Sequence, residues 1–167
     1  MVGSGAGAQS VQRLVIAAIL AGLAGGLLDI VGAIIVYGPI LQTPITPERI
    51  LQSVASGLLG RDAFNGGLGT ASLGLAAHLV ISFVAAGIYV LASTRLLILV
   101  SRPVLSGIAF GVAVYFFMTQ VVVPLSAAPT RPLPALEQFL IALGLNVFLF
   151  GLPIAIIARL CLGEARR

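Results

Sequence analysis

Four strongly polar side chains interrupt the long apolar stretches of this chain of 167 residues: Asp29, His78, Gln120 and Asn146. A carboxylate and an imidazole can exchange protons, and the two amides can donate and accept hydrogen bonds. An ionised group at the centre of a bilayer costs at least about 2.5 kcal/mol, so such groups face the inside of a helix bundle or a wet cavity. These residues are therefore the first candidates for chemistry or for polar packing.

Asp29 and His78 are expected to pair. At helical spacing, each shares a face with small or polar residues, namely Ala21, Gly22, Gly25, Gly32 and Ala33 for Asp29, and Ala71, Gly74, Ser82, Ala85 and Tyr89 for His78. Small residues allow close approach of helices in membranes, so we expect these two faces to meet. A carboxylate favours the charged imidazole and burial opposes it. The pair is therefore either a pH-sensitive contact or a purely structural one, and the sequence leaves both open.

Other residues are candidates for a polar pathway or for helix packing. The candidates for either role are Asn146, Gln120 and Ser82, and the candidates for helix packing alone are Gly22, Gly25, Gly74, Gly107 and Gly111. Gln120 lies nearly opposite the face of Gly107 and Gly111, which places it near the lipid headgroups or a neighbouring subunit. Pro153 should kink its helix, because it lacks a donor and clashes with the carbonyl one turn earlier.

The composition excludes several classes of protein. Hydrophobic residues make up 59% of the chain and charged residues only 8%, whereas soluble domains have roughly 25% charged residues. Every basic residue is an arginine, and the arginines are single or paired at the ends of apolar stretches, unlike the basic clusters of nucleic-acid-binding proteins. The single cysteine, Cys161, excludes a disulfide scaffold. No motif for a metal or a cofactor is evident, so we expect neither, and no nucleic-acid partner.

The apolar stretches predict four transmembrane helices at about residues 14–37, 71–92, 104–123 and 136–160. Each is near the roughly 20 residues that cross a bilayer, and continuous apolar stretches lack the alternation of barrel strands. The expected fold is an all-α four-helix membrane bundle over residues 14–162, with tails at 1–13 and 163–167. A cleaved signal peptide is the alternative for the first stretch. Its apolar region would be only about 7 to 15 residues long and would not contain Asp29.

The first loop should contain a short helix at about residues 47–59. Thr46 is a suitable N-cap, Pro47 suits the first helical position, and Glu48 suits the first turn. One face then carries the apolar side chains of Ile50, Leu51, Val54 and Leu58, which is typical of a helix lying in the membrane interface. An ordinary polar loop is the alternative. The third loop, 124–134, is rich in proline and predicts a stiff connection.

The arginines predict the orientation. Six of nine lie beside the termini and the second loop, namely Arg13, Arg95, Arg102, Arg159, Arg166 and Arg167, whereas Arg49, Arg61 and Arg131 lie in the first and third loops. Positive residues are retained in the cytoplasm, so both termini should be cytoplasmic.

His78, Gly87 and Tyr89, followed by Gly107, Gly111 and Pro124, resemble the pattern of the YagU-type family of small inner-membrane proteins. The resemblance covers the second and third spans well, the first loosely and the fourth hardly, and the family often has a longer first outer loop. It implies a multi-pass protein of the bacterial inner membrane, without an established activity and with a link to acid resistance. It assigns no site residues.

Three classes of function follow. The first is a structural or stress-related membrane protein that oligomerises or binds another membrane protein. The second is a proton or small-solute transport unit that uses Asp29, His78 and Asn146. The third, an intramembrane enzyme, is disfavoured because the chain has one histidine and no nucleophile with a visible base, so we expect no enzymatic activity.

Overall fold

A computed structural model describes residues 4–130 and 134–163, with side chains from residue 11 onward. Four helical stretches are long and apolar enough to cross a membrane: Val11–Ile40, Gly67–Arg95, Pro103–Leu125 and Leu136–Leu162. The all-α four-helix fold is therefore confirmed, and the chain is a multi-pass membrane protein.

The first span is α1 (Ser4–Ile35), continued by η1 (Val36–Ile40), and the second is α3 (Gly67–Arg95). The third consists of α5 (Pro103–Phe117), η3 (Met118–Val122) and α6 (Val123–Leu125). The fourth consists of α7 (Leu136–Leu145), η4 (Asn146–Gly151) and α8 (Leu152–Leu162). The first loop holds α2 (Pro47–Leu59) and η2 (Gly60–Asn65), and the second holds α4 (Ile98–Ser101).

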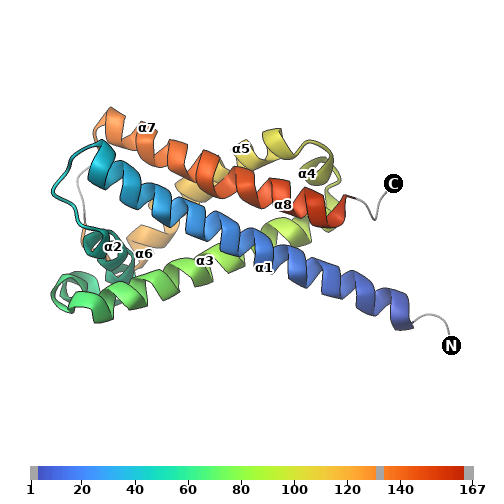
Figure 1. The fold of residues 1–167 in the computed structure, drawn as a ribbon, viewed down its shortest axis with the longest axis horizontal. Coiled ribbons are helices and arrows are strands. Elements are labelled where there is room, and N and C mark those ends of the chain that lie inside the picture. The colour runs from blue at the N-terminus through green and yellow to red at the C-terminus, as the bar shows by residue number, and fades with distance from the viewer. Residues whose placement is uncertain (1–3, 131–133, 164–167) are drawn as a thin grey trace.

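Both chain ends and α4 lie at one end of the bundle, and α2 and α6 lie at the other (Figure 1). We call the part near the chain ends the terminal half and the part near α2 and α6 the loop half. The first span is central, because α1 packs against α3 on one side and against η4 and α8 on the other. The third span packs mainly against η4 and α8.

The main apolar core lies in the terminal half. Its buried members are Ala17, Ala21, Ala86, Tyr89, Val90, Phe150, Ile154, Ala155, Ala158 and Leu162. The Tyr89 hydroxyl donates to the carbonyl of Leu99 in α4 at 2.9 Å, so the polar end of this side chain has a partner in the second loop. Its ring meets Phe110 edge to face, with centroids 4.9 Å apart. The small side chains of this core allow the first, second and fourth spans to pack closely, and its few large side chains fill the space between them.

Widened helical turns occur in three of the four spans, each beside a proline. Pro39 lies within η1, Pro124 follows η3, and Pro153 follows η4. A proline ring collides with the carbonyl four residues earlier, and a π-helical turn relieves that collision by opening the backbone. The π-helical segment Asn146–Gly151 directly precedes Pro153, and the kink expected there stays a prediction.

The helix predicted in the first loop is present with its capping residue. Thr46 accepts a hydrogen bond from the backbone N–H of Arg49 at 3.2 Å, and Pro47 is the first helical residue. Its buried residues, however, are Gln52, Ala55 and Ser56, whereas Leu58 is 62% exposed. The polar, small face therefore packs on the bundle, whereas Ile50, Leu51 and Val54 on the predicted apolar face are half-buried and Leu58 is exposed.

Two predicted boundaries were wrong. α1 begins at Ser4, so residues 4–13 are helical rather than a flexible tail, because extending an existing helix costs little compared with nucleating one. Pro124 belongs to α6 rather than to the third loop, since a proline is tolerated in the first turn of a helix. Arg131, Arg166, Arg167 and most of the predicted C-terminal tail lie outside the described residues.

Candidate functional site

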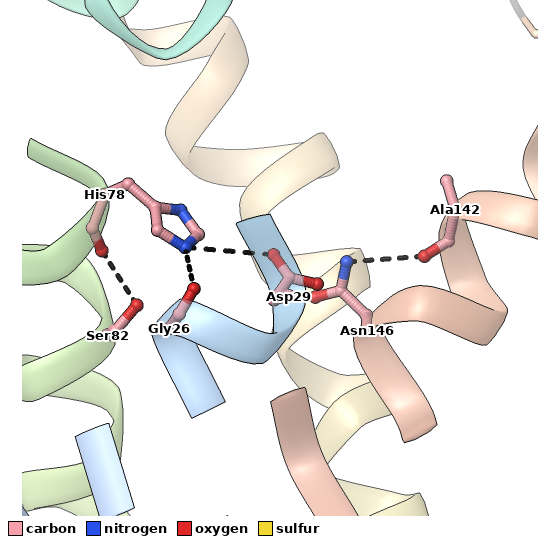
Figure 2. A network of polar contacts seen from close by, with 6 residues as sticks. All are labelled: Gly26, Asp29, His78, Ser82, Ala142 and Asn146. Atoms are coloured by element: carbon pink, nitrogen blue, oxygen red, sulfur yellow. Dashed lines mark hydrogen bonds and ion pairs between the residues drawn. The ribbon is translucent and has the colours of Figure 1, made fainter. Parts of the chain in front are cut away.

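The structure brings Asp29 and His78 together inside the bundle. His78 Nε2 lies 3.9 Å from Asp29 Oδ2 and 2.9 Å from the carbonyl oxygen of Gly26 (Figure 2). The side chain of His78 is 12% exposed and that of Asp29 is 18% exposed. A carbonyl oxygen can only accept, so Nε2 must carry a proton in this contact. The link to Gly26 forms with a neutral or a charged ring, whereas an ion pair with Asp29 needs the charged ring.

Two glycines on α1 make room for this contact. A Cβ atom at Gly22 would lie 2.9 Å from Phe83 Cα, and one at Gly26 would lie 2.7 Å from Ser82 Oγ. Their spacing of four residues places both on the face toward α3, the arrangement that permits close helix packing in lipid. Gly26 was not among the residues predicted from the sequence, although its Gly-x-x-x-Gly spacing from Gly22 was a signal for it.

Ser82 lies in the same interface and is fully buried. Its hydroxyl donates to the carbonyl of His78 at 2.8 Å, one turn earlier on α3 (Figure 2). A serine that bonds back to its own helix in this way satisfies its donor without a partner on another helix. Ser82 is therefore part of the packed contact with Gly26 rather than a free polar group.

Asn146 lies on the side of Asp29 away from His78 (Figure 2). It begins the π-helical segment η4, and its Nδ2 donates to the carbonyl of Ala142 at 3.4 Å. The segment η4 packs against α1, which places this amide in the same half of the bundle as the Asp29–His78 pair. Asn146 therefore extends the polar cluster from the second span to the fourth.

Gln120 does not join this cluster. It lies in η3 and is exposed on the outside of the bundle, on the face that its position opposite Gly107 and Gly111 predicts. Those two glycines pack against the fourth span, since a Cβ at Gly111 would lie 2.6 Å from Val147 Cα and one at Gly107 would lie 2.8 Å from Leu152 Cα.

The expectation that Gly25 and Gly74 lie in the contact between the first and second spans was wrong. Gly25 faces the fourth span, where a Cβ would lie 2.8 Å from Ile154 Cγ1. Gly74 faces α2, where a Cβ would collide with the carbonyl of Leu51. Both glycines allow close packing, but with different partners, because the central first span and α3 each have two packed faces.

Across residues 11–130 and 134–163, every buried side-chain nitrogen or oxygen has a hydrogen-bond partner, and no group of three or more potential metal ligands occurs there. The cluster consists of the ionisable Asp29–His78 contact between the first and second spans and the nearby Asn146 amide on the fourth span.

Comparison with family models, with curated proteins and with solved structures finds no match to this chain.

Proposed function

We propose that this chain is a structural or stress-related protein of the bacterial inner membrane, in which the Asp29–His78 contact holds the first two spans together. The observation that carries this proposal is the position of His78 Nε2, 2.9 Å from the Gly26 carbonyl of α1 and 3.9 Å from Asp29 Oδ2. Polar contacts between spans stabilise membrane bundles by about 0.6 kcal/mol on average and by up to about 2 kcal/mol.

The terminal half favours a structural role over transport. A pathway across the membrane needs polar or hydrated groups along its whole length. In the terminal half, Tyr89 donates to Leu99 and Ser106 donates to Ile98 at 3.2 Å, so both hydroxyls are used locally. The apolar core fills the space between the first, second and fourth spans there.

The proposed orientation places both termini in the cytoplasm. Arg95 ends α3, Arg102 precedes α5, and Arg159 lies in the last turn of α8. These positions are at the end of the bundle where α1 begins and α8 ends (Figure 1), and arginine is retained on the cytoplasmic side. Fusions of a reporter that is active only outside the cytoplasm should be inactive at residue 167 and active after Asn65. Activity at residue 167 would overturn the orientation.

Transport is the second candidate, and the position of Asn146 favours it. Asp29 lies between the His78 ring and the Asn146 side chain in Figure 2, so three spans contribute polar groups to one place in the loop half. Such a cluster resembles the proton-handling sites that ionisable residues form in membranes.

One experiment separates the two candidates. The wild-type chain and the Asp29→Asn variant are reconstituted into liposomes, and proton flux and thermal unfolding are measured for both. The structural role predicts wild-type flux no greater than that of empty liposomes, together with a lower unfolding temperature for Asp29→Asn. Wild-type flux that is lost in a stably folded variant would establish transport instead.

The stress-related part of the proposal needs its own measurement. The resemblance to the YagU-type family suggests a response to acid, and the Asp29–His78 pair is where protonation would change a contact between spans. The unfolding temperature should depend more strongly on pH in the wild type than in Asp29→Asn combined with His78→Gln, because only the wild type has this ionisable pair. Equal responses in the two proteins would overturn an acid-sensing role for this pair.

A further inference from the structure

A groove opens on the side of the terminal half, away from the polar cluster. Its volume is about 460 Å³, within the range of small-molecule sites, and it is lined by Arg102, Pro103, Val104, Leu105, Ile108 and Arg159. It lies where α5 begins, beside the last turn of α8.

The two arginines reach this groove from different elements. Arg102 joins α4 to α5, and Arg159 lies in the last turn of α8. Arg159 Nη1 donates to the carbonyl of Ser101 at 3.3 Å, which uses one of the five N–H groups of its guanidinium. Two exposed cations are thus held beside one opening.

No carboxylate in residues 11–130 or 134–163 forms an ion pair with either arginine. The described carboxylates are all in the loop half: Glu48 lies in the first turn of α2, Asp62 in η2, Glu137 in the first turn of α7, and Asp29 beside His78. Within the described part of the chain, the charge at the groove is therefore uncompensated and complementary to an anion.

The rest of the groove is apolar and faces outward. Val104 is 57% exposed, Leu105 58% and Ile108 37%. These residues follow Arg102 along α5 toward the middle of the membrane, so the lining changes from charged to apolar with depth. Pro103 is the first residue of α5, and the free N–H groups of the first helical turn add partial positive charge at the charged end.

We propose that this groove binds one anionic phospholipid, with its phosphate between Arg102 and Arg159 and an acyl chain along Leu105 and Ile108. The charged end alone would suit any phosphate. The apolar lining beneath it makes a lipid the better occupant than free phosphate. This site is separate from the Asp29–His78 pair and does not depend on the proposed function.

Native mass spectrometry of the full chain in detergent tests the site, with added phosphatidylglycerol or phosphatidylcholine. We expect one phosphatidylglycerol to bind in preference to phosphatidylcholine. Arg102→Gln and Arg159→Gln should each weaken phosphatidylglycerol binding about fivefold, and the double variant should weaken it about 25-fold. The reason is that each basic residue near the membrane surface strengthens the binding of an anionic lipid about fivefold. Arg95→Gln is the matched control, since it removes the same charge at the same end of the bundle but not from the groove.

A second measurement locates the lipid. The chain contains no tryptophan, so Ile108→Trp places a single fluorescent reporter in the groove. Phosphatidylglycerol with brominated acyl chains should quench it more strongly than brominated phosphatidylcholine, and the preference should disappear when Arg102→Gln and Arg159→Gln are added. Inorganic phosphate at millimolar concentration should not displace the lipid.

Three results would overturn the proposal. The first is a phosphatidylglycerol preference that survives loss of both arginines, and the second is an equal loss in Arg95→Gln, which would indicate a general effect of charge. The third is full displacement by inorganic phosphate, which would make the groove a simple anion site. Arg102 is exposed, and its side chain forms no hydrogen bond with residues 11–130 or 134–163, so Arg102→Gln keeps the test valid if Arg159→Gln misfolds.

Discussion

The two halves of the bundle are built differently. The terminal half has continuous α-helices around an apolar core, in which Ile154, Ala155 and Ala158 are fully buried. The loop half contains the Asp29–His78 pair, the three π-helical segments and the inserted helix α2. The difference teaches that the main apolar core and the ionisable pair of the spans occupy separate halves of the bundle, because a carboxylate and an imidazole need polar partners that an apolar core does not offer.

The largest expected effect comes from opening the apolar core. Ile154→Ala removes a fully buried side chain that contacts Gly25, and we expect the free energy of unfolding to fall by about 2 to 3 kcal/mol. Ile156→Ala makes the same change on the same helix at a position 39% exposed, and should cost less than about 0.5 kcal/mol. Denaturant titration in detergent measures both, and equal losses would contradict the assignment of stability to this core.

The next effect concerns α2. A methyl group at Gly74 meets the backbone of Leu51 and Ala55, which cannot move without displacing α2, so Gly74→Ala should cost about 1 to 3 kcal/mol. Gly87→Ala is the control on the same helix, because nothing lies within 4 Å of its added Cβ, and it should be neutral or slightly stabilising. Thermal unfolding distinguishes them. A wild-type melting temperature for Gly74→Ala would show that α2 is not held by this contact.

A smaller effect is expected from the polar pair. We expect a double-mutant cycle of Asp29→Asn and His78→Gln to give a coupling free energy of about 1 kcal/mol, because the two side chains interact across α1 and α3. The four proteins are compared by denaturant titration at one pH. Strictly additive losses would mean that His78 is held by the Gly26 carbonyl alone.

The smallest effect should follow from Gln120→Leu. This amide is exposed on the outside of the loop half, so its loss should change the free energy of unfolding by less than about 0.5 kcal/mol. Size-exclusion chromatography with light scattering should give the same mass for variant and wild type. A change in oligomeric state would reveal that Gln120 contacts a neighbouring subunit.

Much of the site was predictable because its residues share helix faces. Asp29 and His78 were singled out by their cost in lipid, and the small residues around them indicated a close contact. The partner of each glycine was not predictable. Gly25 and Gly26 are adjacent in the sequence, yet they face the fourth and the second span respectively. Helical periodicity tells which residues share a face, but not which neighbour packs on that face.

By itself, the sequence determined the four apolar helices, the capped helix α2 and the rarity of polar groups within the spans, because lipid forces the backbone to form helices and penalises charge. The tertiary structure alone decided that Gly26 accepts from His78, that the polar face of α2 packs inward, and that Arg102 and Arg159 meet at one groove. The physical reason is the solvent. In lipid, a leucine side chain is almost as stable against the acyl chains as against another helix, so hydropathy cannot tell a lipid-facing position from a helix-facing one. Close packing of the side chains decides which face meets a neighbouring helix.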